Sequence, residues 1–547
     1  MDSLRSLCSF AANEAATRFV KALLTDGAHG VTRPTLLHSP AKHSFAHLSA
    51  SVISPLEARR GGVMIVQLQN PMAFNPQLTR LLFALLAALA FNAAAVTHYV
   101  DLNSPSPTPP YTNWLTAATN IQDAVDAAVD GDIVLVTNGV YATGGRLASG
   151  SALTNRVVIT QAITVQSVNG YATTIIQGNA PVSPAAVRCV YLADNATLIG
   201  FTLTNGATRG SGAFSDISAA GAWCESSNST ISSCLIVSNT AASSGSYGGG
   251  VGSGVNYGGA GNHGNGVGSI VRNCIISQNS AAFGGGAIFC VLDNCLLAFN
   301  KASQTGAAAA GSILINCTVY SNSSPATAVI FDSTLENSIV YYNPAPSVSL
   351  SIATNCCVQG GGAQAGNFTN APLFKNILLG DLRLQTNSPC INAGKNSFVA
   401  NTTDFDGNPR ISGGTVDIGA YEFQSPTSVL SYAWAQQNGL PTDGLADFTD
   451  ADGDGANNWQ EWRADTSPTN VASALLMGTA TNGVTGLVVS WASVATRSYW
   501  LERGADLSVA SPFQTIATNI PGVAGTKTYN DTSATNGGPY FYRVGVQ

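Results

Sequence analysis

Charged residues are scarce in this sequence. They make up 10% of its 547 residues, whereas an average soluble domain contains roughly 25%. Gly, Ser, Thr, Asn and Ala are abundant instead. A low-charge composition of this kind favours an extracellular, β-rich protein over a cytosolic enzyme, and a chain of this length should hold several domains.

A hydrophobic run long enough to remain in a membrane is also missing near the N-terminus. The apolar run from Leu81 to Phe91 would form about 16 Å of helix, against the roughly 30 Å of a bilayer core. Arg80 precedes it and the small residues 93–95 follow it, which is the order of a secretory signal peptide. We therefore predict a signal peptide at 72–95, a natural start at Met72 or Met64, and a non-native or disordered extension at 1–71. After signal removal we expect no transmembrane span.

Clustered positive charge is absent as well. Residues 1–95 contain 8 basic and 4 acidic residues, which leaves 15 basic and 26 acidic residues in 96–547. Nucleic acids and anionic membranes bind clustered positive charge, so we expect neither as a partner. The balance suits a soluble, monomeric, exported protein.

The cysteines lack the spacing of a metal or redox site. No C-x-x-C motif occurs, and only His98 and His263 remain after residue 95 to complete a zinc site. We therefore interpret the cysteines as structural. Stacked coils could permit a disulfide, but parallel stacking rarely gives its geometry.

A repeat is the clearest positive feature. The segments SCLIVSN, NCIISQN, NCLLAFN, NCTVYSN and NSIVYYN end at Asn239, Asn279, Asn300, Asn322 and Asn343, and an older copy, IGFTLTN, ends at Asn205. The last three steps are 21, 22 and 21 residues, and the two earlier ones are 34 and 40. Such a period predicts a solenoid. Because the leucine spacing of leucine-rich repeats is absent, we predict a right-handed parallel β-helix over 96–424, with about three short strands per coil.

Equivalent residues of successive coils should stack about 4.8 Å apart. Asn279, Asn300, Asn322 and Asn343 would then form a ladder at one bend, where Asn tolerates the left-handed conformation and its amide bonds to its neighbours. Cys234, Cys274, Cys295 and Cys317 would stack inside as small buried hydrophobes.

Two further segments belong to this solenoid. Residues 120–129 predict an amphipathic helix and 132–137 a strand, so the helix would cap the open end of the first coil. The glycine-rich segment 244–268 either leaves the solenoid as a loop or builds coils where backbones pass closely.

The opening AATNIQDAVDAAVDGDIVLVTNGVY and the block SPCINAG…TTDFDGNPRISGGTVDIGAYEF (388–423) carry a family likeness. The chain resembles bacterial exported right-handed β-helix proteins, and the second segment is similar to the choice-of-anchor Q module, here the closing block (381–424). The resemblance implies a module that closes the β-helix, held together by Asp404, Asp406, Arg410, Asp417 and Glu422. Relatives with this fold include pectate lyases, polygalacturonases and adhesins, so the fold alone does not give the function.

Catalytic signatures are sparse in the predicted β-helix. No adjacent Asp pair supplies the acid and base of glycoside hydrolysis. Arg272 and Asp293 occupy equivalent positions of neighbouring coils, with Glu336 further along, and they are the candidate catalytic residues of a lyase or hydrolase. A surface ladder of ion pairs explains the same pattern.

The segment DADGDGANNWQE (450–461) fits the calcium-loop pattern D-x-D-x-D-G-x5-E without a gap. The predicted Ca²⁺ ligands are Asp450, Asp452, Asp454, the carbonyl of Ala456, Asn458 and Glu461. The segment resembles thrombospondin type 3-like or dockerin-like repeats. Since one loop is evident, we expect it to stiffen a linker rather than bind a cohesin, with a linker at 425–440 and the calcium segment at 441–470.

Residues 471–547 alternate as strands do. Trp491 early and Tyr540 and Tyr542 late resemble a fibronectin type III-like β-sandwich. Such a module can bind glycan or act as a spacer, and we expect its aromatic residues to form its core.

Three functions remain open. The first is an exported or cell-surface protein that binds polysaccharide or a cell-surface glycan, or acts in adhesion. The second is a polysaccharide lyase or glycoside hydrolase that uses the groove of the β-helix. The third is a structural stalk.

Overall fold

The computed structural model describes residues 95–254, 268–325, 328–344, 346–361, 366–535 and 537–547. The predicted extension (1–71) and the predicted signal peptide up to residue 94 lie outside these residues, as does His263. Within the described ranges, no helix is long and apolar enough to cross a membrane.

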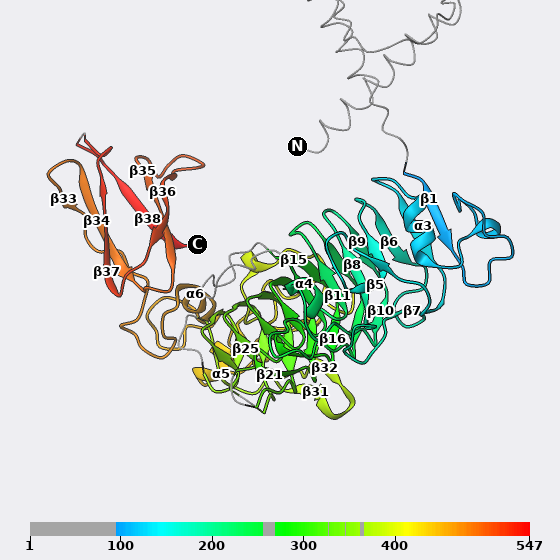
Figure 1. Cartoon of the computed structure of the whole chain (residues 1–547). Coiled ribbons are helices and arrows are strands. Elements are labelled where there is room, and N and C mark those ends of the chain that lie inside the picture. The colour runs from blue at the N-terminus through cyan, green and yellow to red at the C-terminus, as the bar shows by residue number, and fades with distance from the viewer. Residues whose placement is uncertain (1–94, 255–267, 326–327, 345, 362–365, 536) are drawn as a thin grey trace, which may run out of the picture. The chain divides into compact units, whose positions relative to one another are not determined.

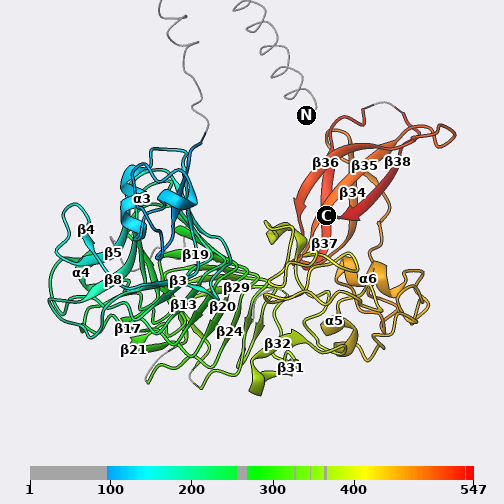
Figure 2. The same cartoon turned by 90° about the vertical axis from the view of Figure 1, so that its right-hand side faces the viewer.

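Residues 97–358 form a right-handed parallel β-helix, which confirms the predicted fold class. Successive coils add parallel strands to three sheets, here named A, B and C (Figures 1 and 2). Sheet A contains β1 (Thr97–Val100), β2 (Ile133–Val136), β6 (Thr164–Ser167), β9 (Thr197–Ile199), β12 (Thr230–Ser232), β15 (Ser269–Arg272), β19 (Cys290–Asp293), β23 (Ile313–Ile315), β26 (Thr334–Glu336) and β29 (Ile352–Thr354).

The other two sheets complete each coil. Sheet B contains β3 (Gly139–Tyr141), β7 (Thr174–Gln177), β10 (Thr202–Thr204), β13 (Leu235–Val237), β16 (Ile275–Ser277), β20 (Leu296–Ala298), β24 (Thr318–Tyr320), β27 (Ile339–Val340) and β30 (Cys357–Val358). Sheet C contains β4 (Arg146–Leu147), β5 (Thr154–Ile159), β8 (Val187–Leu192), β11 (Ala222–Cys224), β14 (Val251–Ser253), β18 (Ala287–Ile288), β22 (Ala309–Ala310), β25 (Ile330–Phe331) and β28 (Val348–Ser349), with β4 antiparallel to β5. A small parallel pair, β17 (Ser280–Phe283) and β21 (Lys301–Thr305), lies between sheets B and C.

The core lies inside the coils. The middle residue of each short strand points inward, as strand alternation requires. Ile231, Val271, Leu292 and Leu314 are stacked in register in sheet A and all are fully buried. The apolar positions on either side of each cysteine therefore mark the interior.

The predicted asparagine ladder forms at the bend after sheet B. Asn279 Oδ1 accepts hydrogen bonds from the backbone N and the Nδ2 of Asn239, both at 3.0 Å. Asn300 Oδ1 accepts the same two bonds from Asn279, at 3.0 and 3.1 Å. The pattern continues to Asn322 and Asn343. Each buried amide is thus satisfied by the next coil.

One detail of the ladder prediction and one of the repeat alignment were wrong. The left-handed conformation belongs to the residue before each ladder asparagine, such as Gln278 (φ 57°), and to the asparagine of the NC pair, such as Asn294 (φ 57°). Asn205 aligns with Ser238, the residue before the ladder asparagine Asn239, because Thr204 is in register with Val237. Gly206 takes the ladder position and donates its N–H to Asn239 Oδ1 (2.8 Å).

The described cysteines lie inside the coils, as predicted. All ten described cysteines are buried and free. The backbone N–H of Cys234 points to the sulfur of Cys274 (3.3 Å), and that of Cys317 donates to the hydroxyl of Ser338, which takes the cysteine position in the next coil (3.0 Å).

The first coil carries the predicted cap. After a 3₁₀ turn, η1 (Trp114–Thr116), helix α3 (Ile121–Ala127) begins behind Asn120, whose side chain accepts from the N–H of Asp123. Ile121 and Val125 are buried in the β-helix core. The helix therefore covers apolar residues that the first coil would otherwise expose.

Part of the glycine-rich segment builds a coil. Helix α4 (Phe214–Ile217) lies in the long connection before it. A Cβ at Gly250 would lie 2.6 Å from the carbonyl oxygen of Gly286, and one at Gly286 would lie 2.5 Å from that of Ala308. The backbones of successive coils pass too closely here for any side chain. Residues 255–267 lie outside the described ranges.

The closing block packs against the side of the β-helix. Ile391 and Ile418 share a hydrophobic core with Leu296 and Ile339 on the outer face of sheet B. Gly419 donates its N–H to the carbonyl of Asn337 (2.8 Å). The block and its flanks contain β31 (Phe374–Asn376), η2 (Ile377–Leu379), β32 (Asp381–Leu384), η3 (Asn396–Phe398) and α5 (Tyr432–Gln437). Its contacts extend over several coils, not only the last one.

The C-terminal residues form helix α6 (Asn458–Ala464) and two antiparallel three-stranded sheets. One sheet contains β33 (Thr481–Asn482), β34 (Leu487–Ser493) and β37 (Gly525–Asp531), and the other β35 (Ser498–Gly504), β36 (Gln514–Pro521) and β38 (Phe541–Val546). Val489, Trp491, Tyr499 and Leu501 form their common core.

Candidate metal centre and the polar stripe of the β-helix

The predicted calcium loop is a tight turn followed by a helix. Gly453 and Gly455 have φ values of 80° and 94°, which other residues rarely adopt. Asp450 accepts hydrogen bonds from the N–H groups of both glycines, at 2.7 and 2.9 Å. Helix α6 then begins behind Asn457, which forms a capping box with Gln460. The aspartates at the start of the motif thus lie in the turn, and Glu461 at its end lies in the first turn of α6.

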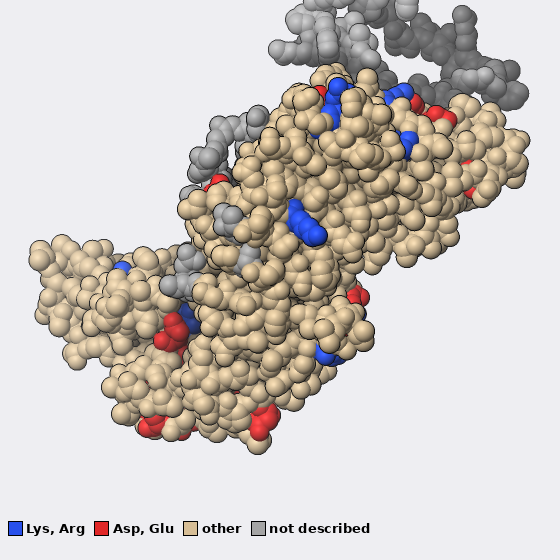
Figure 3. Space-filling model, turned by 60° about the horizontal axis from the view of Figure 1, so that its bottom comes forward, with Lys and Arg blue, Asp and Glu red and all other residues tan. Residues whose placement is uncertain are grey.

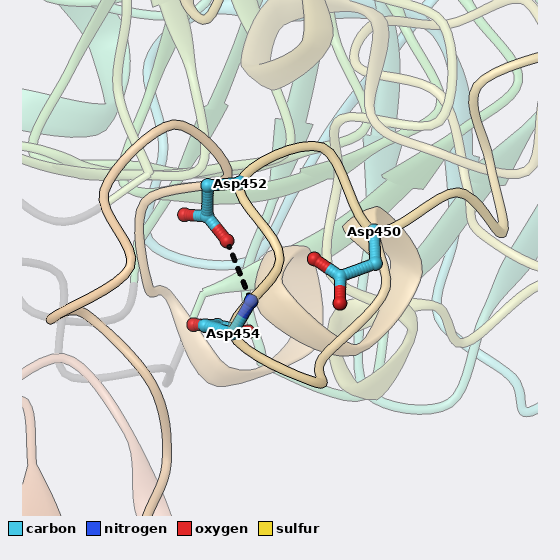
Figure 4. A group of neighbouring side chains, drawn as sticks. All are labelled: Asp450, Asp452 and Asp454. Carbon is cyan, nitrogen blue, oxygen red and sulfur yellow. Dashed lines mark hydrogen bonds between the residues drawn. The ribbon is translucent and has the colours of Figure 1, made fainter.

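The three aspartates gather on one side of the loop (Figure 4). Each offers one carboxylate oxygen, and these oxygens lie within 4.8 Å of one another. Asp452 Oδ1 accepts from the N–H of Asp454 (3.3 Å), and Asp454 Oδ1 from that of Ala456 (2.8 Å). One oxygen of Asp452 and one of Asp454 thereby hold the loop and leave the other unused, whereas both oxygens of Asp450 accept loop N–H groups.

The remaining oxygens are buried and lack hydrogen-bond partners. They are Asp452 Oδ2, Asp454 Oδ2, Asn458 Oδ1, Glu461 Oε1 and Glu461 Oε2. A buried oxygen without a partner costs about 1–3 kcal/mol, and more when it is charged. These five oxygen atoms, together with the predicted ligands Asp450 and the carbonyl of Ala456, fit Ca²⁺, which takes six to eight oxygen ligands. The residues present therefore fit the predicted ion.

Electrostatics at Glu461 point the same way. Burial, together with the charges of Asp452, Asp454 and Asp450, raises the pKa of Glu461 to about 7. Asn458 holds its amide in place by donating Nδ2 to the carbonyl of Ala446 (2.8 Å), so its oxygen is left for a cation. A bound divalent cation would offset the repulsion between these carboxylates.

The loop is tied to its surroundings on two sides. Asp447 accepts from Ser428 Oγ (2.7 Å) and from the N–H of Val429 (2.8 Å), while its own carbonyl accepts from the N–H of Trp459 (2.9 Å). On the other side, Arg497 Nε donates to the carbonyl of Arg463 (2.9 Å). Ordering the loop therefore orders the connection between the closing block and the C-terminal sheets. The sequence spacing gave no signal for Asp447.

The second candidate site is the stripe formed by Arg272, Asp293 and Glu336 on sheet A. Arg272 and Asp293 are in register, as predicted, but Ile315 lies between Asp293 and Glu336. Asp293 does not form an ion pair with Arg272 in the described structure; its Oδ2 accepts from Asn401 Nδ2 of the closing block (2.5 Å). The stripe is not a continuous row of charges.

The closing block covers Asp293 within this stripe. Asp293 is only 5% exposed, and its Oδ1 and Arg272 Nε are buried without partners. Burial raises the pKa of Asp293 to about 6 although Arg272 and Asn401 favour its charged form. No sequence signal brings Asn401, over a hundred residues away, onto Asp293. Because Asn401 lies against Asp293, a polymer chain could reach Asp293 only if the residues near 401 moved.

The charged side chains of the closing block bond mainly to its backbone. Arg410 donates to the carbonyls of Ala420 (3.0 Å), Asp417 (2.9 Å) and Gly419 (2.7 Å), and its Nη2 lies 3.8 Å from Glu422 Oε2. The carboxylates of Asp404, Asp417 and Glu422 accept backbone N–H groups. Asp406 pairs with Arg383 at 2.6 Å. All these groups are engaged in holding the block.

Comparisons with known proteins give weak likenesses only. No family model and no curated protein matches the chain. Among solved structures, the chain is similar to pectate lyase Pel9A, with 17% identity, a TM-score of 0.31, and coverage of 60% of this chain and 96% of that one. It is similar to the pectin methylesterase from Aspergillus niger, with 13% identity, a TM-score of 0.29, and coverage of 51% and 91%. It is also similar to the alginate lyase from Paenibacillus sp., with 14% identity and a TM-score of 0.26. That match covers 46% of this chain and 89% of the lyase.

Proposed function

We propose that this protein is an extracellular polysaccharide-binding β-helix protein whose ligand is a neutral glycan and whose loop 450–461 holds Ca²⁺. The observation that carries the ligand is a hydroxyl row on the outer face of sheet A. Thr164, Thr197 and Thr230 are in register in successive coils and all are partly exposed. Within the described part of the chain, none of these three hydroxyls bonds to the protein.

The geometry of this row suits a periodic polymer. Parallel stacking repeats the same hydroxyl about every 4.8 Å along the axis. Gln166 and Ser232 add amide and hydroxyl groups on the same face, two residues after Thr164 and Thr230. A chain molecule with many equivalent hydroxyl groups can therefore make the same contact in coil after coil.

Charge favours a neutral ligand over an acidic one. The excess of acidic residues after residue 95 would repel a polyuronate. Figure 3 shows a face on which Lys and Arg are few and scattered, without a broad positive patch. The row itself contains no charged residue in these three coils.

The enzymatic alternative has less support in the geometry. Its candidate acid, Asp293, is covered and bonded to Asn401, and the side chains of Arg272 and Asp293 form no ion pair in the described structure. A base that removes a sugar proton must come within hydrogen-bond reach of it. Binding without turnover fits the exposed row better.

A co-migration experiment tests the proposed function. The calcium-loaded full chain is incubated with a neutral glucan, a neutral mannan, polygalacturonate and alginate, and size-exclusion chromatography then reports polymer length and protein position together. We expect co-migration with a neutral polymer of unchanged length. The triple variant Thr164→Val, Thr197→Val, Thr230→Val keeps the β-branched shape and should lose co-migration.

The matched control is Thr526→Val with Thr528→Val, two exposed threonines on β37, and it should bind as the wild type does. Shortened polymer would overturn the binding function in favour of the lyase or hydrolase. Co-migration with the acidic polymers alone would overturn the neutral ligand class.

A further inference from the structure

We infer that the C-terminal sheets carry a second glycan-binding site, in which the indole of Trp500 stacks on a neutral sugar ring. The site lies on the outer face of the sheet β36–β35–β38. It takes its ligand class from the proposed function, but it lies on different residues and can fail separately.

Strand alternation turns Trp500 away from the core. Its neighbours Tyr499 and Leu501 are 1% and 0% exposed and belong to the core of the C-terminal sheets. Trp500 therefore points to the opposite face, where it is partly exposed. The expectation that the aromatic residues of this region form its core is wrong for Trp500.

A glycine lets the indole lie against the sheet. Trp500 is directly opposite Gly545 on β38, so both point to the same face. A Cβ placed on Gly545 would overlap the indole atoms Cζ2 and Cε2. The ring consequently lies across strand β38, in the space that any other residue at 545 would fill.

Polar groups flank the ring on the same face. Glu502 and Arg543 are opposite each other in the next pair, and Arg543 Nε donates to Glu502 Oε2 (2.5 Å). The Arg543 guanidinium lies 5.7 Å from the centroid of Trp500 and 4.5 Å from that of Phe513. Its side chain is 54% exposed, and Thr515 Oγ1 donates to Glu502 Oε1 (3.1 Å). The site thus combines aromatic surface with exposed donors and acceptors.

These features select a neutral sugar as the occupant. The two charges of Glu502 and Arg543 are paired, so the patch has no net charge to attract an ionic ligand. An aromatic side chain contributes about 150–250 Å² at most, so the two rings cannot approach the roughly 800 Å² that each partner buries in a stable protein interface. A neutral sugar ring matches both the absence of net charge and the small area. Its C–H face packs on the indole, and its hydroxyls bond to Glu502 and Arg543.

Binding of the same neutral polymers to the calcium-loaded full chain tests the site. Kd is measured by isothermal titration, and tryptophan fluorescence is followed in parallel. We expect Trp500→Ala to weaken binding roughly tenfold, the loss of about 1.4 kcal/mol of contact. Gly545→Ala keeps the indole but displaces it, and we expect it to weaken binding as well. Thermal unfolding identifies any variant that fails to fold.

Trp114→Ala is the matched control, because Trp114 is 40% exposed and packs edge-on against Tyr99 at 4.4 Å in the first coil. It should leave Kd unchanged. Unchanged Kd in folded Trp500→Ala and Gly545→Ala, with loss only in the threonine triple variant, would overturn this site and leave the proposed function standing. Loss only in the Trp500 and Gly545 variants would support this site and overturn the sheet A row. A wild-type chain that binds no neutral polymer would overturn both.

Discussion

At the scale of single residues, Glu461 combines a fully buried carboxylate with two unpartnered oxygens and three nearby aspartates. A ligand that binds only the folded state at a hundred times its Kd adds about 2.7 kcal/mol of stability. We predict that Ca²⁺ raises the melting temperature of the wild type and that Glu461→Gln removes most of this rise. Thermal unfolding with and without Ca²⁺ measures both.

The same substitution should act in the opposite direction without the ion. Because Glu461→Gln removes one of four repelling carboxylates, the calcium-free variant should be more stable than the calcium-free wild type. Asp443→Asn, an exposed residue seven positions before the loop, is the control and should respond to Ca²⁺ as the wild type does. An equal rise in Glu461→Gln would contradict the assigned ligand.

Asp293 gives a prediction for pH. Its pKa is raised by burial from 3.8 to about 6, so the folded state holds the proton more tightly than the unfolded state does. Its contribution to stability is therefore full below about pH 4 and is lost as the pH rises through about 6. The difference corresponds to about 3 kcal/mol. We predict that Asp293→Asn is more stable than the wild type at pH 7 and equal to it at pH 3.5, as measured by urea unfolding.

Asp194 supplies a control of opposite sign. Hydrogen bonds from Ser226 and Asn228 lower the pKa of this exposed carboxylate, so its contribution is present at neutral pH and lost in acid. Asp194→Asn should be slightly less stable than the wild type at pH 7 and equal to it at low pH. A shift of the same sign in both variants would contradict the burial of Asp293.

Residue-scale sequence patterns predict sites built from consecutive residues best. The proximity of the three aspartates in loop 450–461 could be predicted because they come from one short segment with fixed spacing. Asp293 and Arg272 could be aligned by counting along the coils, but Asn401 reaches Asp293 through packing of the closing block, which no local spacing encodes. The outward position of Trp500 was missed, although alternation along β35 accounts for it, and so was the space for its indole over Gly545.

At the scale of elements, the asparagine ladder joins coils through buried side chains. Asn279 bonds to Asn239, to Asn300 and to the carbonyl of Ile236. Asn279→Ala would leave several buried backbone groups unsatisfied, each at about 1–3 kcal/mol. We predict a loss of roughly 3 kcal/mol in the free energy of unfolding, measured by denaturant titration.

The neighbouring residue is the matched control for this element. Gln278 is exposed and has a φ of 57°, which glycine adopts without strain. Gln278→Gly should change stability by less than about 1 kcal/mol. A similar loss in both variants would mean that the bend, and not the amide ladder, holds the coils.

The elements of the β-helix were predictable because each coil repeats the same local signals. Apolar residues beside each cysteine mark the interior, and the period gives the number of coils. The placement of the left-handed residue was missed because it differs among coils: Ser238, Gln278, Phe299, Ser321 and Tyr342 share that backbone conformation but no chemistry. The irregular earlier coils also hid the one-residue offset of Asn205.

At the scale of the whole molecule, the segment with the predicted calcium loop lies between the closing block and the C-terminal sheets and is hydrogen-bonded to residues on both sides. Asp447 bonds to Ser428 and Val429, and Arg497 bonds to Arg463 at the end of α6. We predict that chelation of calcium exposes residues 441–470 to proteases and leaves the β-helix intact. Limited proteolysis with mass spectrometry, with and without EDTA, locates the cuts. The same cuts under both conditions would contradict a stiffening role for the ion.

The packing of the closing block against the side of the β-helix limits where the chain can accept inserted residues. The coils that share its hydrophobic core, with Leu296, Tyr320 and Ile339 on their outer faces, are the ones with steps of 21 or 22 residues. The longer steps of 34 and 40 residues lie before them. A single residue added between Leu296 and Ile339 would shift the later of these apolar side chains away from their partners in the block, so this part of the chain should tolerate insertions poorly.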